Sequence, residues 1–395
     1  MAYLFERFPS FGQTFCLREV AELERQGWDV RIFSIRRPNE ELVHHGSGDL
    51  ARRVHYLPDE TALLDDVNKR SAARELPAEA IEAIREWGRR PDFLRLQQAA
   101  YVGMQLRCAG IHHVHAHFAG MAARTAFWIR RFFGTAYSFT AHANDIFVPT
   151  RFEIGLEQLV ESAAAVVTVS DYSVAWLRER FPQQGKKLRR IYNGIDPSQF
   201  AQRGMASVVP LILSIGRLIE KKGFADLIAA CALLKNRGWK FRCEIVGDGP
   251  LADDLQKQID ASRLQSVVQL IGPRTQPEIA ESLARASAFV LPCVADAQGG
   301  MDNLPTVIME AMAAGVPVVS TRLAGIPEMI DENITGRLVS PHAPDALAGA
   351  LEELLQEPEL AETMGEQGRV RAAERFSVEK NVSELASLFS RVLGS

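Results

Sequence analysis

Short runs of consecutive apolar residues alternate along the chain with longer segments whose apolar residues recur every three or four positions. Strands buried on both faces produce the first pattern, and helices that cover a sheet produce the second. The chain is therefore predicted to form parallel sheets covered by helices. The predicted strands are 29–34, 113–117, 137–141, 165–170, 210–215, 242–246, 267–271, 288–292 and 316–321, and the predicted helices include 19–26, 224–236, 251–262 and 276–286.

The strand–helix series falls into two parts, because residues 197–209 are polar, rich in turn formers and without period. We predict a first doubly wound domain over 1–200, with a helical insert at about 58–106, and a second over 208–375. A final amphipathic helix over 376–395 is expected to cross back to the first domain. The fold class is thus α/β, with two Rossmann-like domains facing each other across a cleft, where ligands are expected.

Composition narrows the functional classes. The net charge of −4 excludes a large basic surface for nucleic acid. The five cysteines form no CxxC pair, which argues against a zinc ribbon or a disulfide framework and fits a reducing compartment. Neither a signal peptide nor an apolar run of membrane-spanning length is expected, so we predict a cytoplasmic protein.

The segment 299–319, GGMDNLPTVIMEAMAAGVPVV, places a carboxylate in an apolar run. Pro305 predicts a helix that begins about there and runs to Ala314, with Glu310 in its second turn and Asp302 in the preceding loop. Unbonded amides at the start of such a helix bind anions, and Glu310 can accept hydrogen bonds from ligand hydroxyls. A core helix with one satisfied buried Glu remains the alternative.

Two glycine-containing loops follow predicted strands. In SIGRLIEKKGF (214–224), Arg217 and Lys222 lie near a strand end and suit a diphosphate, although a solvated charge cluster is equally consistent. In EIVGDGPLADDL (244–255), Gly247 and Gly249 belong to a G-x-G-x-x-A match. The acid that should end the next strand of a nicotinamide dehydrogenase is missing, so we retain only a glycine turn that lets backbone approach a nucleotide.

Histidines cluster in IHHVHAHF and TAHANDIF. Strand alternation puts His113, His115 and His117 on one face, which resembles a metal ligand set and leaves a metal hydrolase as one alternative. The sequence has no D-x-D metal-binding pair, no Walker A loop and no G-x-S-x-G elbow. His142 stands apart in the second segment.

Taken together, Arg217 with Lys222, the GDGPL loop, and Asp302 with Glu310 ahead of AMAAGVPVV resemble retaining glycosyltransferases of family 4, which have the GT-B fold. The resemblance covers nearly the whole chain, from FPSFGQTF through HVHAHFAG, FTAHANDIF and IYNGIDPSQF to AGIPEMI. Within the family, these sequence motifs are most similar to those of bacterial exopolysaccharide enzymes such as the enzymes of colanic acid assembly.

The resemblance implies a metal-independent hexosyltransferase that uses a UDP-sugar or GDP-sugar donor and no cofactor. Arg217 and Lys222 would neutralise the diphosphate, Glu310 would bind the ribose, Asp302 would hold the sugar, and His142 would line the sugar pocket. Retention is thought to proceed by front-face attack, in which a donor phosphate oxygen takes the acceptor's proton. The expected donor-binding residues are Gly12, Gly216, Arg217, Lys222, Gly247, Gly249, Asn303, Leu304, Pro305, Thr306 and Glu310, and the expected catalytic residues are His142, Asp302 and Glu310.

Two positions depart from the family pattern: Asp302 replaces the usual Glu, and Gln13 replaces an acid before Thr-Phe. The expected acceptor is a glycan or lipid-linked glycan. The helix expected in 120–134 carries Arg124, Arg130 and Arg131 and suggests peripheral contact with an anionic membrane, although a core helix with a basic outer face is the simpler interpretation. A non-catalytic nucleotide-sugar-binding protein and a GT-B-like sugar epimerase remain the functional alternatives.

Overall fold

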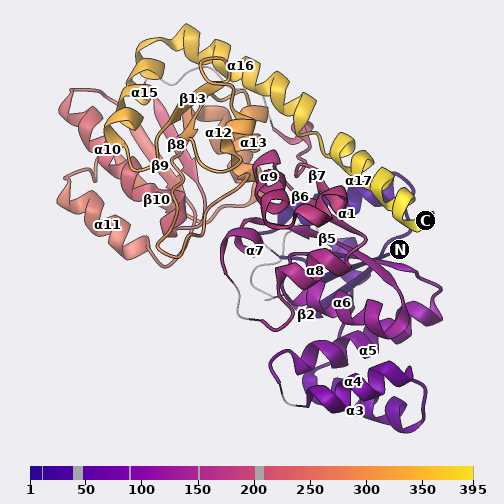
Figure 1. The fold of residues 1–395 in the computed structure, drawn as a ribbon. Helices are drawn as coiled ribbons and strands as arrows, with labels where there is room; N and C mark the ends of the chain where they lie inside the picture. Colours follow the sequence, from indigo (N-terminus) through magenta and orange to yellow (C-terminus); the bar gives the residue numbers. More distant parts are fainter. Residues whose placement is uncertain (11, 39–47, 89, 150–151, 201–208, 395) are drawn as a thin grey trace. The chain divides into compact units, whose positions relative to one another are not determined.

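The computed structural model describes residues 1–10, 12–38, 48–88, 90–149, 152–200 and 209–394. Two compact units divide the chain. The first comprises Met1–Val169, Ser173–Ile191 and Val382–Ser395, and the second comprises Ser170–Tyr172 and Tyr192–Asn381. Each unit contains one parallel sheet with helices packed on it (Figure 1). The prediction of an α/β fold with two doubly wound domains is confirmed.

The sheet of the first unit has seven strands in the order β3-β2-β1-β4-β5-β6-β7. All neighbouring pairs are parallel, and the order reverses beside β1 as in other doubly wound sheets. The strands are β1 Ala2–Arg7, β2 Arg31–Arg36, β3 His55–Tyr56, β4 His113–His117, β5 Ala136–Ala141, β6 Ala165–Thr168 and β7 Leu188–Arg190. The apolar pattern did not predict β1, β3 or β7.

Helices of the first unit include the insert predicted over 58–106. Its helix α5 packs against α6, and a Cβ at Gly103 would lie 2.2 Å from the Phe133 ring, so the two helices approach too closely for a side chain there. The helices that begin before residue 182 are α1 Thr14–Arg25, α2 Gly48–Arg52, α3 Glu60–Ala72, α4 Ala78–Trp87, α5 Phe93–Cys108, α6 Met121–Phe133, α7 Ala143–Phe147, α8 Leu156–Ser162 and α9 Asp171–Arg180.

The sheet of the second unit has six parallel strands in the order β10-β9-β8-β11-β12-β13. The strands are β8 Leu211–Ile215, β9 Arg242–Val246, β10 Val268–Gly272, β11 Ala288–Leu291, β12 Val318–Thr321 and β13 Gly336–Val339. The helices are α10 Phe224–Asn236, α11 Ala252–Ala261, α12 Gln276–Arg285, α13 Thr306–Ala313, α14 Ile326–Met329, α15 Pro344–Gln356 and α16 Pro358–Arg375. Helix α10 has the predicted bounds.

The chain passes from the first unit to the second between Ile191 and Tyr192, ahead of the predicted break at 197–209. The reason is a backbone link inside the second unit, where the Ile195 amide donates to the Phe376 carbonyl (2.8 Å). Residues 201–208 of the predicted break lie outside the described residues.

The C-terminal helix α17 (Val378–Leu393) starts in the second unit, and its residues from Val382 onward belong to the first. In the first unit its Phe389 ring packs against His115 and His113, with ring centroids 5.0 and 5.9 Å away. The amphipathic pattern predicted for this helix is confirmed, because Val382, Leu385, Leu388 and Phe389 are all buried.

One expectation about α6 is wrong: Arg124 does not belong to a basic outer face. Its side chain is 3% exposed, with Nε 3.2 Å from Asp92 Oδ2 and the guanidinium carbon 3.4 Å from the Phe152 ring centroid. Arg130 and Arg131 are exposed as expected.

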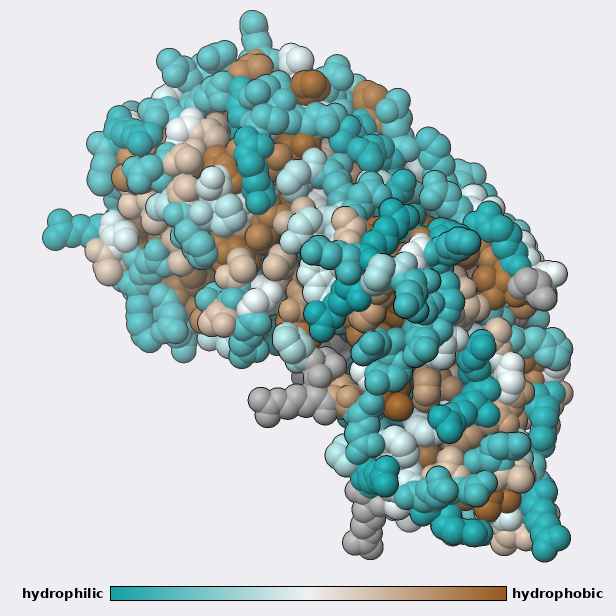
Figure 2. Space-filling view, in the orientation of Figure 1, coloured by the Kyte–Doolittle hydropathy of each residue, from teal (hydrophilic) through white to brown (hydrophobic). Residues whose placement is uncertain are grey.

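No helix in the described part of the chain is long and apolar enough to cross a bilayer. Figure 2 shows mostly hydrophilic residues on the face in view, with hydrophobic residues in small groups between them.

Candidate functional site

Two lysines and an aspartate meet at the carboxyl edge of the second sheet. Strand β8 ends at Ile215, and the short 3₁₀ helix Glu220–Lys222 follows in the next loop. The Lys222 Nζ donates to Asp302 Oδ2, and the Lys221 Nζ lies 3.1 Å from Asp302 Oδ1. The Lys222 stem passes over Gly216, where a Cβ would lie 3.3 Å from its Cδ and Cε. The structure thus brings the predicted residues Gly216, Lys222 and Asp302 together.

These three charged side chains are largely buried, with 13% to 15% of their surface exposed. Burial opposes ionisation of Asp302, but Lys222 and Lys221 outweigh it and lower the pKa of the carboxyl group. Burial likewise opposes the charge on Lys222, and Asp302 outweighs it and raises the pKa of the ammonium. Asp302 and Lys222 are therefore both charged at neutral pH, and two lysines around one carboxylate give the cluster a formal charge of +1.

Lys221 was not among the predicted residues. The adjacent lysines of the EKK sequence were the available signal, but sequence alone does not show that both turn toward the same carboxylate. Cys293 also borders the cluster, with Sγ 3.9 Å from Asp302 Oδ2. Burial and the Asp302 charge raise the pKa of Cys293, so it stays a neutral thiol.

Helix α13 begins beside this cluster, as the segment 299–319 predicted. It starts at Thr306, directly after Pro305, and ends before Gly315, whose φ of +71° suits a glycine. No side chain caps the helix start. The Ile308 amide donates to the Pro305 carbonyl (3.1 Å), and the amides of Thr306 and Val307 precede the first carbonyl to which the helix could pair them. Leu304 and Pro305 are buried, and Glu310 lies in the second turn with 1% of its surface exposed. The helix start therefore offers amide donors next to the lysines.

Asn303 links this loop to another part of the second unit. Its side chain is 3% exposed, and its Oδ1 accepts a hydrogen bond from Ser170 Oγ (2.7 Å). A Cβ at Gly325 would lie 2.8 Å from the Asn303 carbonyl oxygen, so the glycine permits this packing. The Asn303 side chain thus fixes the loop, and Ser170 is a contributor that the sequence did not indicate.

The glycines of the GDGPL loop have a packing role that the sequence did not indicate, and their approach to a nucleotide stays a prediction. A Cβ at Gly247 (φ +143°) would lie 2.0 Å from the Gly216 carbonyl oxygen, and one at Gly249 would lie 2.5 Å from the Leu218 carbonyl oxygen. The Leu218 amide also donates to the Asp248 carbonyl (2.9 Å). Both glycines let the loops after β8 and β9 lie against each other, so the close approach is between two loops of the protein. As predicted, β10 ends without an acid.

Arg217 lies on the same loop as Lys222, but it is not part of the lysine–aspartate cluster. It is exposed, and its guanidinium forms no ion pair with any residue that the structure describes. It is therefore available to an anion at the end of β8.

In the first unit, His142 directly follows β5 and is the N-cap residue of α7. Its backbone amide donates to Asp145 Oδ2 (2.9 Å), which fixes the turn. Its Nε2 lies 3.4 Å from Nδ1 of His117, at the end of the neighbouring strand β4. His117 Nε2 lies 2.9 Å from Glu19 Oε1, which also accepts from the Tyr3 hydroxyl (2.6 Å). A chain of polar contacts therefore connects the buried Tyr3 with His142.

His117 and His142 differ in charge within this series of polar contacts. Burial opposes the charge on His117, but Cys16 and Glu19 outweigh it and raise the pKa of His117 to about 10. Burial and the neighbouring His117 charge lower the pKa of His142 well below its usual range. His142 is therefore neutral beside an imidazolium. Because His142 Nε2 accepts a hydrogen bond from His117, the ring proton of neutral His142 lies on Nδ1, which is then the hydrogen-bond donor.

The predicted clustering of histidines on one face of β4 is confirmed. Glu19, His115 and His117 offer potential metal-ligating atoms within 4.8 Å of one another. However, the two ring nitrogens of His115 lie 2.8 Å from Ser138 Oγ and 3.0 Å from Thr140 Oγ1. Both nitrogens of His117 are also in contact with protein groups. The residues thus fit a buried hydrogen-bond network better than an open metal site.

The assignment of Gly12 to donor binding remains a prediction. Gly12 is exposed, and a Cβ there would meet no atom within 4 Å. The preceding residue 11 lies outside the described residues.

Comparisons with known proteins agree with this architecture. The profile of Glycosyltransferase Family 4 matches residues 12–199, and that of Glycosyl transferases group 1 matches residues 196–371. The chain is 31% identical to the amylovoran biosynthesis glycosyltransferase of Erwinia amylovora, over 89% of each chain. It is 30% identical to an Escherichia coli K12 protein named for colanic acid biosynthesis, over 97% of each.

Among solved structures, the Anabaena protein HepE in complex with UDP-glucose has the same GT-B fold. It superposes with a TM-score of 0.75 and 18% identity, over 99% of this chain and 100% of that one. The extended sequence identity to the two biosynthetic enzymes shows that the chain belongs to the family 4 glycosyltransferases.

Proposed function

We propose that this glycosyltransferase is retaining and metal-independent, and that it moves a hexose from a UDP-sugar or GDP-sugar to a glycan or lipid-linked glycan in bacterial polysaccharide biosynthesis. The polysaccharide role is supported by the amylovoran and colanic acid names of its relatives. A nucleotide-sugar donor is supported by the UDP-glucose complex of the structural neighbour.

The observation that carries the proposal is the arrangement of Lys221, Lys222 and Asp302 beside the start of α13. Transfer breaks the bond between the anomeric carbon and the diphosphate, so negative charge grows on the leaving group. Two ammonium groups, the Arg217 guanidinium and the first amides of α13 supply fixed positive potential for that charge. In this proposal no divalent cation is required, and the acceptor's proton leaves on a donor phosphate oxygen.

Single positions take the following parts in the proposal. Asp302 accepts from the sugar hydroxyls while Lys221 and Lys222 hold its carboxylate in place. Glu310 accepts from the ribose hydroxyls, which explains a carboxylate on a buried helix. His142 is assigned to the sugar, to which its neutral ring donates a hydrogen bond from Nδ1.

The experiment is a thermal-shift panel of UDP, GDP and their sugar adducts on the wild type and on Glu310→Gln. A ligand at 100 times its Kd stabilises the wild type by about 2.7 kcal/mol. We expect Glu310→Gln to lose most of this shift, and Glu281→Gln, an exposed acid on α12, to keep it. If Glu310→Gln binds nucleotide as well as the wild type, the ribose assignment is wrong.

Product analysis separates the proposal from its rivals. A transferase releases nucleoside diphosphate when an acceptor is added, whereas a nucleotide-sugar-binding protein releases none and an epimerase changes the sugar without an acceptor. Dialysis against a chelator tests metal independence, and the transfer rate is expected to be unchanged.

Peripheral contact of α6 with an anionic membrane also belongs to the proposal. Because Arg124 is buried against Asp92, only Arg130 and Arg131 of the three predicted arginines remain for it. Co-sedimentation with anionic vesicles tests this part separately from transfer.

A further inference from the structure

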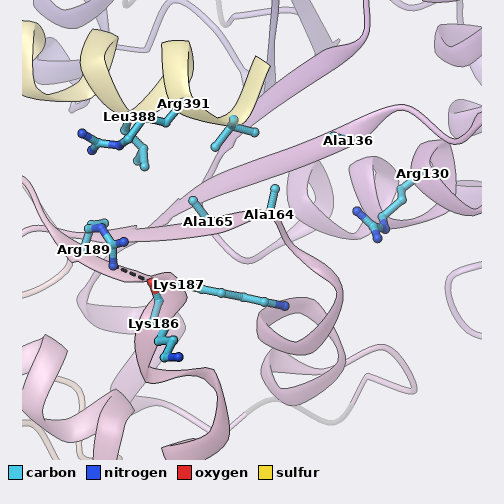
Figure 3. Close-up of a pocket in the computed structure, with 10 residues that line it drawn as sticks. Arg130, Ala136, Ala164, Ala165, Lys186, Lys187, Arg189, Leu388 and Arg391 are labelled. Carbon is cyan, nitrogen blue, oxygen red and sulfur yellow. Dashed lines mark hydrogen bonds between the residues drawn. The ribbon is translucent and has the colours of Figure 1, made fainter. Parts of the chain in front are cut away.

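A cavity of about 400 Å³ lies in the first unit at the amino end of its sheet (Figure 3). Two of the lining residues, Ala136 and Ala165, are the first residues of β5 and β6. His142 follows the opposite, carboxyl end of β5, so the cavity is distinct from the region assigned to the sugar. Its lining consists of Arg130, Ala136, Ala164, Ala165, Lys186, Lys187, Arg189, Leu388, Arg391 and Val392.

Half of these lining residues are cationic and none is acidic. The five cations come from four separate elements, namely α6, the 3₁₀ helix Pro182–Lys187, β7 and α17. The chain as a whole has slightly more acidic than basic residues, 49 against 45. An acid-free group of five cations around one hollow is therefore not a consequence of overall composition.

The positive charges of this cavity have no carboxylate partners among the described residues. Lys187 Nζ donates to the Glu161 carbonyl oxygen (2.5 Å), and Arg189 Nη1 donates to the Lys186 carbonyl oxygen (2.6 Å). Both acceptors are neutral, so neither hydrogen bond itself compensates a positive charge. Burial and the Arg130 charge lower the pKa of Lys187, with a smaller opposing effect of Glu161. An anion in the cavity would relieve the repulsion between the cations.

We propose that this cavity binds a phosphate group, carried by a ligand other than the sugar donor. A guanidinium group such as that of Arg130 or Arg391 can present two parallel N–H donors to phosphate oxygens, and the ammonium groups of Lys186 and Lys187 add charge. The volume lies in the range of small-ligand sites. Leu388, Val392 and the alanines form an apolar wall for the carbon part of the ligand. The ligand is either a soluble phosphorylated compound or a phospholipid headgroup. The soluble-ligand outcome does not rest on the proposed function, whereas the headgroup outcome shares Arg130 with the membrane contact proposed for α6.

The test uses the full chain and two probes, pyrophosphate in calorimetry and vesicles of phosphatidylglycerol or phosphatidylcholine in co-sedimentation. The cavity variant is Arg130→Gln with Arg391→Gln, because both side chains are exposed and form no ion pair in the described structure. The charge-matched control is Arg74→Gln with Arg85→Gln, two exposed arginines outside the cavity. An Arg217→Ala variant reports any pyrophosphate bound at the proposed donor site.

We expect the cavity variant to bind pyrophosphate, or phosphatidylglycerol vesicles, at least about tenfold more weakly than the wild type, since each charged hydrogen bond contributes about a factor of ten. The charge-matched control should stay within about twofold. Arg217→Ala should weaken only the pyrophosphate binding that occurs at the proposed donor site and leave the vesicle binding unchanged. Loss of pyrophosphate binding identifies a soluble ligand. Loss of phosphatidylglycerol binding alone identifies a headgroup. The proposal is overturned if the wild type binds neither probe, or if the cavity variant binds as the wild type does. Should the double variant misfold, Arg391→Gln alone is measured in its place.

Discussion

Replacing Asp302 by Asn tests the lysine–aspartate cluster of the second unit directly. At an effective dielectric constant of about 20, charges 3.1 Å apart attract by about 5 kcal/mol before desolvation is counted. Removing one partner of a buried ion pair costs about 3–5 kcal/mol, because the remaining charge stays buried without compensation. Since the three side chains keep 13% to 15% of their surface exposed, we expect the lower end, about 3 kcal/mol.

Differential scanning calorimetry measures this loss. For a unit of about 190 residues, 1 kcal/mol corresponds to about 2–4 °C, so the transition of the second unit should fall by about 6–12 °C. Asp254→Asn is the control, because its ion pair with Lys257 is 68% and 75% exposed and is screened by solvent. A transition of Asp302→Asn within about 1 °C of the wild type would refute the reasoning.

The pH dependence of the stability difference between the wild type and Asp302→Asn gives a second check. Because the pKa of Asp302 is lowered on folding, its contribution is present above its unfolded value of 3.8 and is lost as the pH falls through the folded value. Because the pKa of Lys222 is raised, its contribution is present below 10.5 and is lost as the pH rises through the folded value. The stability gap between wild type and Asp302→Asn should therefore be flat from pH 5 to pH 9.

Three further predictions concern other parts of the chain. Gly247→Ala should destabilise the second unit by several kcal/mol, because its Cβ would lie 2.0 Å from a carbonyl oxygen. Gly349→Ala, on the open face of α15, should instead stabilise it by about 1 kcal/mol. Urea denaturation measures both free energies of unfolding, and equal effects would be inconsistent with the close loop contact. Burial lowers the pKa of His113 to about 4, so between pH 6.5 and pH 4 the unfolded state takes up a proton before the folded state does, and the free energy of unfolding should drop by up to about 3 kcal/mol. His113→Asn should remove this part of the pH dependence of the urea midpoint. An unchanged pH dependence in the variant would count against the prediction. Glu19→Gln should lower the pKa of His117, as measured by NMR titration of its ring protons. An unchanged pKa would argue that Glu19 does not stabilise the protonated form of His117.

Local patterns were sufficient for most elements of the fold. Buried strands such as β4 and β9 and the helix α10 were predicted with their observed bounds, because a continuous apolar run or a helical period reports burial of that segment alone. Very short strands such as β3, with two residues, and β7, with three, are too brief to show a period. The bounds of α13 followed from Pro305 and Gly315, which act on the backbone locally.

The sequence by itself determined two parallel-sheet units, the position of α13 and the candidates Lys222, Asp302 and Glu310, since each depends on residues close together in the chain. Only the tertiary structure decided that Lys221 also pairs with Asp302, that Glu19 meets His117 98 positions away, and that cations from four elements line the proposed phosphate cavity. Strand order places such side chains together, and that order arises from packing whole elements, which no local period of hydrophobic residues encodes.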